Sequence, residues 1–241
     1  MSTQSATARR RKSTPALSTA LLRSIAVLAG ILGLAAIYGG STLLISGVAH
    51  YQAQAFIEHW EQKPSAPTEP AWQIAHAAIN RAIHTHPGPN GAYLETLGYI
   101  QQWRTFGLDL NDPQAREHRQ AAAQALRDAT HARPTWPFAW SSFAYAKMTL
   151  LSFDEEFTHA LQQAQHFGPW RIGVNRRIAE IGLIAFDALN DEQRALAAES
   201  MRRTARFSTR EHAQLLALAK QTHHVSALEN ALQDSEPNAA Q

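Results

Sequence analysis

Histidine and acidic side chains have the clearest capacity for chemistry in this sequence, because they bind metals and transfer protons. The 241-residue chain has twelve histidines and no cysteine, which excludes thiolate catalysis and disulfides. His84 and His86 lie two residues apart, and His223 and His224 are adjacent. Neither pair has the HExxH spacing that puts two zinc ligands and a base on one helix face. We therefore expect no metal site and no cofactor.

One acidic run could be mistaken for a catalytic pair. Asp154, Glu155 and Glu156 stand together at the start of a predicted helix. Carboxylates there complement the helix dipole, which is sufficient reason for their presence. The sequence also lacks a GxSxG nucleophile turn and a glycine-rich phosphate loop. We expect no catalytic residues and no enzymatic activity.

Aromatic residues and paired arginines are the remaining candidates for ligand contact. Aromatic rings stack on sugars, and arginines bind carboxylates and phosphates. In a helical protein such residues more often pack inside the fold or lie on a solvated face. The candidates are Trp103, Trp136, Trp170, Arg176 and Arg177.

Charge is distributed unevenly along the chain. Residues 1–49 have five basic residues and no acidic ones, whereas the remaining 17 basic residues face all 20 acidic residues, a net charge of −3. This balance argues against a nucleic-acid-binding domain. The basic residues of the N-terminal arm are Arg9, Arg10, Arg11, Lys12 and Arg23.

An uncharged segment follows this basic arm. Ile25–Ala49 has 25 residues and would form a helix of about 37 Å, against about 30 Å for a bilayer core. We predict a transmembrane helix over residues 24–49. Because positive residues resist translocation, residues 1–23 are expected to be a cytoplasmic tail. The rest would be periplasmic, with the anchor in a bacterial inner membrane.

Cleavage of this segment is the alternative. Ala53-Gln54-Ala55 resembles a small-x-small cleavage site. However, the apolar segment is much longer than the 7–15 residues typical of a signal-peptide core. We favour an uncleaved anchor.

The composition after the anchor favours an all-α domain. Alanine, glutamine, arginine and leucine dominate, and runs of valine and isoleucine are missing. Residues 50–70 are expected to continue the membrane helix and end in a proline-rich linker, and residues 233–241 to be a disordered tail. Within the domain, residues 71–232, we predict helices over 71–86, 91–106, 113–132, 136–151, 154–167, 170–188, 190–206 and 208–232.

A pattern recurs three times within this domain. An apolar pair is followed by an alanine three positions after its second member, and by a proline five positions further on. Small residues on one helix face let a neighbouring helix approach, and the proline ends the hairpin. Such repetition is typical of stacked helical hairpins. The repeat-packing residues are Ala78, Ala82 and Pro87, then Ala125, Ala129 and Pro134, then Ala160, Ala164 and Pro169.

The helices that follow the prolines carry a second pattern, Leu97-Gly98, Phe143-Ala144 and Ile178-Ala179. Together the two patterns resemble the tetratricopeptide repeat (TPR) family over residues 71–188. The resemblance implies an α-α superhelix, with an insertion near residues 105–117 to explain the longer first interval. An array of α-hairpins without TPR geometry remains the alternative.

A weaker resemblance covers most of the chain. The basic tail, the anchor, Gly168-Pro169-Trp170 and the segment Asn175–Leu183 are similar to VpsP-type proteins. These are encoded with bacterial exopolysaccharide and capsule genes. The resemblance implies an accessory role in polysaccharide polymerisation or export, without catalytic residues.

These features favour a membrane-anchored scaffold whose partners are the inner membrane and other envelope or polysaccharide-assembly proteins, with no nucleic acid. A repeat groove suits a partner's peptide or helix. Direct binding of polysaccharide or cell wall is the main alternative. An envelope enzyme using glutamate and histidine is a third hypothesis.

Overall fold

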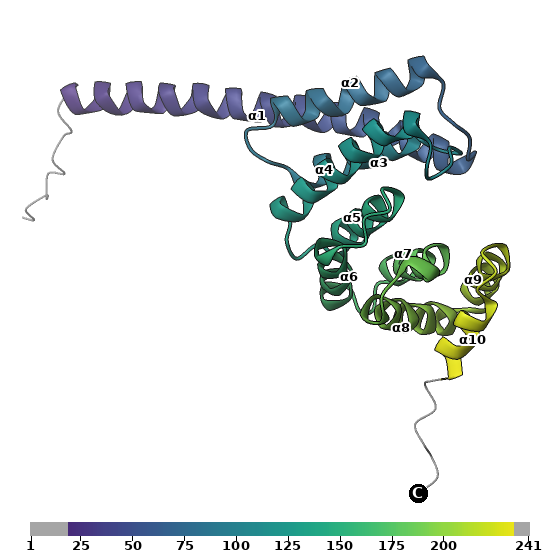
Figure 1. Cartoon of the computed structure of the whole chain (residues 1–241). Coiled ribbons are helices and arrows are strands. Elements are labelled where there is room, and N and C mark those ends of the chain that lie inside the picture. Colours follow the sequence, from purple (N-terminus) through teal and green to yellow (C-terminus); the bar gives the residue numbers. More distant parts are fainter. Residues whose placement is uncertain (1–18, 234–241) are drawn as a thin grey trace, which may run out of the picture. The chain divides into compact units, whose positions relative to one another are not determined.

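The computed structural model describes residues 19–233, and these residues form helices and connections with no strand among them. The all-α prediction is confirmed for this part of the chain (Figure 1). The α-helices are α1 (Thr19–Gln62), α2 (Glu69–Thr85), α3 (Gly91–Arg104), α4 (Arg116–Ala132), α5 (Pro137–Thr149), α6 (Glu155–Phe167), α7 (Ile172–Ile184), α8 (Asp191–Phe207), α9 (Thr209–Gln221) and α10 (Val225–Gln233). Two short 3-10 helices are η1 (Pro113–Ala115) and η2 (Phe186–Ala188).

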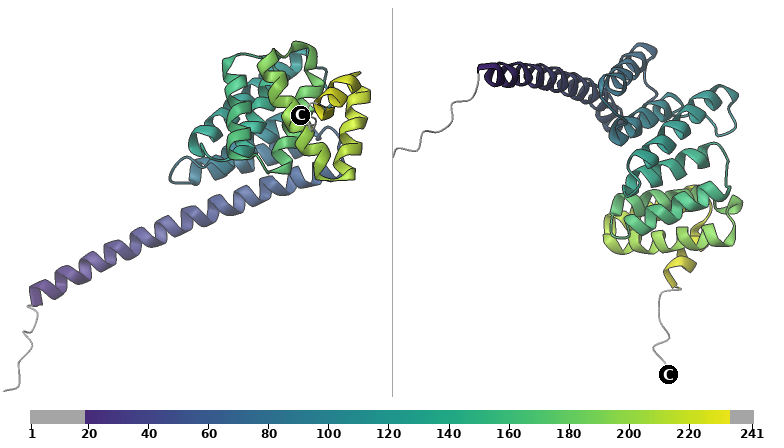
Figure 2. Two further views of the ribbon diagram at one scale, coloured as in Figure 1. Left: turned by 90° about the horizontal axis from the view of Figure 1, so that it is seen from below. Right: turned by 90° about the vertical axis from the view of Figure 1, so that its left-hand side faces the viewer.

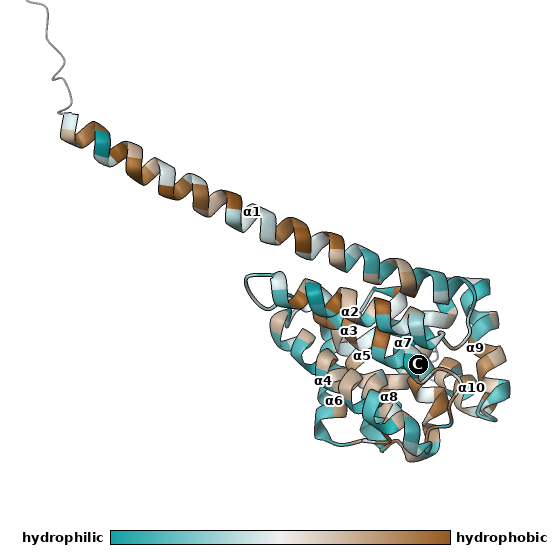
Figure 3. Cartoon of the chain, turned by 90° about the horizontal axis from the view of Figure 1, so that it is seen from above, coloured by the Kyte–Doolittle hydropathy of each residue, from teal (hydrophilic) through white to brown (hydrophobic). Residues whose placement is uncertain are grey.

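The chain divides into two units, residues 1–42 and residues 43–241. In the first unit the structure describes the N-terminal part of α1, which is almost entirely apolar (Figure 3). Leu34 and Ile37 are 69% and 70% exposed. Ser41 and Thr42 donate their hydroxyl hydrogens to the carbonyls of Tyr38 and Gly39, so their polar groups are satisfied within the helix. These polar groups are therefore compatible with an apolar environment.

Among the described residues, α1 is the one helix long and apolar enough to cross a membrane. This agrees with the predicted span at residues 24–49 by length and composition. Of the five basic residues expected to fix its direction, Arg23 lies in α1 and is exposed. Arg9, Arg10, Arg11 and Lys12 lie outside the described residues.

The C-terminal part of α1 belongs to the second unit and packs into it. Ala53 is fully buried and Trp60 is 4% exposed, in one hydrophobic cluster with Ile79 of α2 and Ile100 of α3. Residues 50–70 were expected to continue the membrane helix and to end in a proline-rich linker. In the structure α1 continues to Gln62, and residues 63–68 form the linker before α2. The C-terminal part of α1 also supplies a buried face to the domain, which the sequence did not predict.

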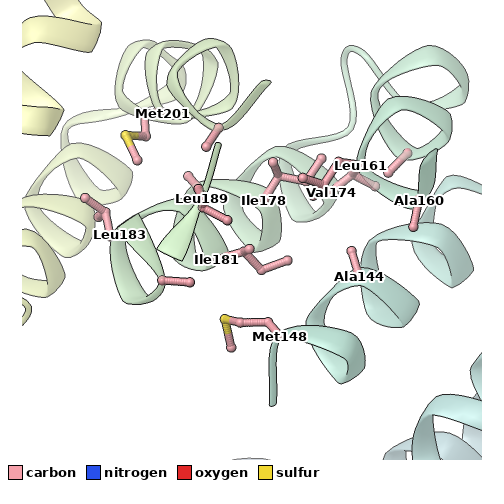
Figure 4. Packing of buried hydrophobic residues seen from close by; sticks show 14 of the residues in the cluster. Ala144, Met148, Ala160, Leu161, Val174, Ile178, Ile181, Leu183, Leu189 and Met201 are labelled. Carbon is pink, nitrogen blue, oxygen red and sulfur yellow. The ribbon is translucent and has the colours of Figure 1, made fainter. Parts of the chain in front are cut away.

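The helices after the linker pack in chain order (Figure 2). Helix α3 packs on α4, α5 on α6 and α7 on α8, while α5 also contacts α3 and α7. The main core lies along this series, as Figure 4 shows for Met148, Ile178, Leu183 and Met201. Each of these four side chains is at most 1% exposed.

The recurring alanines lie in these helix contacts. All six are at most 5% exposed, because a methyl group is small enough to fit between closely packed helices. Each of the three prolines lies in a connection between consecutive helices: Pro87 precedes α3, Pro134 precedes α5 and Pro169 precedes α7.

Side-chain caps explain several helix starts. Asp154 caps α6 by accepting a hydrogen bond from the Phe157 amide, as the acidic run predicted. Asn190 and Gln193 form a capping box at α8. Asp112 caps η1, so the predicted helix 113–132 begins with a 3-10 turn before α4.

The predicted helices over 170–188 and 208–232 are wrong in their extent. The first ends as α7 at Ile184 and is followed by η2. The second is broken between α9 and α10, where His223 has a φ of 61°. The imidazole of His224 then bonds to the carbonyl oxygen of Leu183 in α7. Tertiary packing overrides helix propensity at this turn.

Candidate functional site

Two adjoining clefts lie across α1, α3, α5 and α7 in the second unit. One has a volume of about 420 Å³ and the other about 560 Å³. Glu61 of α1 and Tyr99 of α3 line both clefts, so the two clefts adjoin at these residues. We call the residues lining both clefts the helix groove.

One wall of the helix groove is apolar. Phe106, Leu108 and Leu110 lie on the loop between α3 and η1, and they are 38–41% exposed. Phe106 stacks on Trp103 with ring centroids 5.0 Å apart. Gly107 turns the loop with a φ of 79°, a conformation that glycine adopts without steric cost. The loop falls within the insertion that the sequence predicted, and it supplies partly exposed apolar surface to the groove.

Arg119 of α4 holds this loop in place. Its guanidinium donates to the carbonyl oxygens of Leu108 at 3.1 Å, Asp109 at 2.9 Å and Leu110 at 2.5 Å. The residue is only 4% exposed. These three bonds pair the two terminal nitrogens of a buried cation and fix the path of the loop, because leaving these nitrogens unpaired would be costly.

A hydrogen-bonded pair lies where the two clefts meet. The Tyr99 hydroxyl is 2.8 Å from both Glu95 and Ser142, and it donates to the Glu95 carboxylate. Burial raises the pKa of Glu95, although its hydrogen bond with Tyr99 acts in the opposite direction. Burial also raises the pKa of Tyr99. The two hydrogen bonds of the Tyr99 hydroxyl give this part of the groove a fixed polar geometry.

The far end of the helix groove combines an aromatic ring with charges. The Arg177 guanidinium lies over the Tyr145 ring at 4.8 Å, and its Nε is 3.9 Å from Glu180. Burial raises the pKa of Glu180, while the neighbouring arginines oppose the shift. An apolar segment carrying a charged or polar side chain could be held between this end and the inserted loop.

The predicted ligand-contact residues do not form one site. Trp103 and Arg177 line one cleft of the helix groove, and Trp136 lines the other, where Arg133 covers its ring at 4.2 Å. Arg176 points elsewhere and forms an ion pair with Glu211. Trp170 lies in a separate cleft and is 86% exposed.

Several groove residues could not be selected from the sequence. Glu61, Glu95, Tyr99 and Arg119 carry no motif, and they come from three helices that the fold brings together. The only feature of the sequence that pointed to this groove was the predicted insertion, because it contains the loop that Arg119 binds.

The acidic run has a structural role. Lys147, 4% exposed, donates to Asp154 at 2.8 Å and to Glu156 at 2.7 Å. Arg127 forms two further hydrogen bonds to Glu156. Burial opposes ionisation of Asp154, but hydrogen bonds from Lys147, the Phe157 amide and Ser152 outweigh it and lower the pKa of Asp154 to about 2. The carboxylates therefore stabilise the contact of α4, α5 and α6.

Two of the four histidines singled out in the sequence, His86 and His224, have side-chain partners. His86 is 2.7 Å from the carbonyl oxygen of Gly88, and His224 lies 3.4 Å from Asp187. Among residues 19–233, no three histidine or acidic side chains are grouped as a metal site.

No protein-family model matches this chain, and the comparison with curated proteins gives no match either. The class is therefore defined by the fold and the groove alone. The described chain is an all-helical series of packed helices with one helix that could span a membrane.

Proposed function

We propose that the protein is a membrane-anchored interaction module that binds a segment of an envelope protein in the helix groove. One observation carries the proposal: the groove runs across four helices and combines partly exposed apolar side chains with fixed charged groups. This composition suits a peptide or amphipathic helix, whose apolar side chains would contact the inserted loop.

The packing of the helices supports a TPR-like array, with α3/α4, α5/α6 and α7/α8 as successive hairpins. The recurring alanines are buried between helices. A Cβ atom on Gly98 would lie 2.5 Å from the Leu126 Cγ, so this position needs its small residue. In such an array the first helices of successive hairpins line the binding face, as α3, α5 and α7 line the groove.

The proposed location is a bacterial inner membrane, with the N-terminus in the cytoplasm and the domain in the periplasm. The basic arm before an uncharged segment supports this orientation. An anchor confines the domain to the membrane surface and raises its local concentration near membrane partners.

The process we propose is exopolysaccharide or capsule assembly, on the basis of the VpsP-type resemblance. Deletion of the gene should reduce surface polysaccharide, and the intact chain should restore it. A variant with the groove change Tyr145→Ala should restore less polymer at equal protein level. Normal polymer in the deletion strain would exclude this role.

Site-specific photo-crosslinking in intact cells tests the groove. A benzoylphenylalanine at Phe106 or Tyr145 should capture the same membrane or periplasmic protein, identified by mass spectrometry. The control position is Gln124, which is exposed on α4 and lines neither cleft. Equal capture at the control position, or no adduct at either groove position, would contradict the proposal.

A further inference from the structure

A third cleft, of about 560 Å³, lies outside the helix groove, between the turn before α7 and the side of α8. Its lining includes Trp170, Phe207 and three arginines: Arg202, Arg203 and Arg206. The only acidic residue in the lining is Glu199. The cleft therefore has a local charge of +2 in a domain whose net charge is −3. This local excess attracts an anionic ligand.

Trp170 presents a flat aromatic surface at this cleft. The side chain is 86% exposed, which is unusual for a large apolar residue, and Phe207 nearby is 62% exposed. Arg203 lies 5.6 Å from the indole centroid. An exposed indole beside cationic groups offers stacking for a ring that also carries negative charge.

The turn that carries Trp170 is held rigidly. Asn175, only 2% exposed, donates to the carbonyl oxygen of Pro169 at 3.0 Å, and Arg203 donates to the same oxygen at 3.2 Å. Ser200 of α8 donates in turn to the Asn175 amide oxygen. The backbone that carries the indole is thus fixed before any ligand arrives, which lowers the entropy cost of binding.

The three arginines differ in their availability. Arg202 and Arg203 share the carboxylate of Glu199, with Nε distances of 3.0 Å and 2.7 Å. Arg206 is exposed, and within the described part of the chain its side chain has no hydrogen bond or ion pair. Its guanidinium is free to bind a carboxylate in a bidentate manner.

We propose that this cleft binds an acidic oligosaccharide, with a pyranose ring stacked on Trp170 and its carboxylate bound by Arg206. A sugar ring has an apolar face for the indole and, in a uronic acid, a carboxylate at its edge. A cleft of this volume falls in the range of small-ligand sites. The choice of a saccharide over a nucleotide assumes the periplasmic orientation proposed above, whereas it does not depend on the role of the helix groove.

The test uses the full-length chain in nanodiscs of neutral phosphatidylcholine, with titration calorimetry as the readout. Tetragalacturonate should bind, and neutral maltotetraose should bind at least about tenfold more weakly. Trp170→Ala and Arg206→Gln should each weaken tetragalacturonate binding by about tenfold. Arg81→Gln is the matched control, because Arg81 is exposed on α2 and is not in the cleft.

Higher salt should weaken binding by the wild-type protein more than binding by Arg206→Gln. Equal binding of the neutral and acidic sugars, or no effect of either cleft substitution, would overturn the proposal. Cleft-dependent binding of glycerol phosphate that exceeds binding of tetragalacturonate would also overturn it, because a lipid headgroup would then be the better ligand. Unchanged melting temperatures of the variants would show that the loss is not due to unfolding.

Discussion

At the scale of single residues, Lys147 of α5 binds two carboxylates at the start of α6. Its ammonium group is buried and bonds to Asp154 and Glu156, and Arg127 completes the network. Lys147→Met removes the cation and leaves carboxylates that are partly open to water. We expect the free energy of unfolding to fall by about 1–3 kcal/mol. Urea unfolding of the detergent-solubilised chain, followed by near-ultraviolet circular dichroism, would measure the change. Equal unfolding midpoints for the wild type and Lys147→Met would contradict a stabilising role for Lys147.

The lowered pKa of Asp154 predicts a pH dependence. Its pKa is about 2 in the folded protein and 3.8 ordinarily, so ionised Asp154 stabilises the fold above about pH 4. This contribution is lost as the pH falls toward 2. The stability of Asp154→Asn should therefore lie below that of the wild type at pH 7 and approach it near pH 2. Parallel stability curves between pH 7 and pH 2 would contradict the pKa shift.

Arg119 is expected to control the order of the groove loop. Arg119→Met removes the donors to Leu108, Asp109 and Leu110, so the loop should open and become a protease site. Limited proteolysis should cut residues 105–112 several-fold faster in this variant. Arg116→Met is the control, because Arg116 is exposed and makes no such bonds. Equal cleavage rates in both variants would show that Arg119 does not hold the loop in place.

At the scale of elements, close helix contacts depend on small residues. A Cβ atom on Gly182 of α7 would lie 2.4 Å from the Ala197 Cβ of α8. The Ala197 methyl cannot rotate away, so the helices must separate. Gly182→Val should lower the free energy of unfolding by about 2–3 kcal/mol. Gly88→Val, at a position where a Cβ meets nothing within 4 Å, should change it by less than about 0.5 kcal/mol.

The sequence pattern predicted most helices, but it did not predict every break or buried face. Alanine spacing and prolines identified the positions of α2 to α7, because local propensity and packing agree there. The break at His223 carried no glycine or proline signal, since it depends on the contact of His224 with α7. The burial of Ala53 and Trp60 could not be predicted from the sequence either. These residues lie at the C-terminal end of α1, after its long apolar segment, and only the fold brings α2 and α3 against them.

The candidate sites were less predictable than the fold. Trp103, Trp136 and Trp170 were identified by type, but their grouping was not, because they line three different clefts. Trp170 lies with arginines of α8, not with Arg176 and Arg177. Such partners come from helices distant in sequence, and only tertiary structure brings them together.

At the scale of the whole molecule, the proposed function depends on an anchor that holds the domain outside the cytoplasm. The uncharged segment and the basic arm before it are the basis for this orientation. The absence of cysteine allows a direct test with single introduced thiols. Ser65, exposed in the linker before α2, and Ser13, next to the basic cluster, mark the two sides of the predicted span.

The most direct measurement is labelling of Ser65→Cys and Ser13→Cys variants in intact spheroplasts with a membrane-impermeant maleimide. We expect the thiol at position 65 to react in intact spheroplasts, and the thiol at position 13 to react only after lysis. Labelling at position 13 without lysis, or protection of position 65 until lysis, would contradict the central claim.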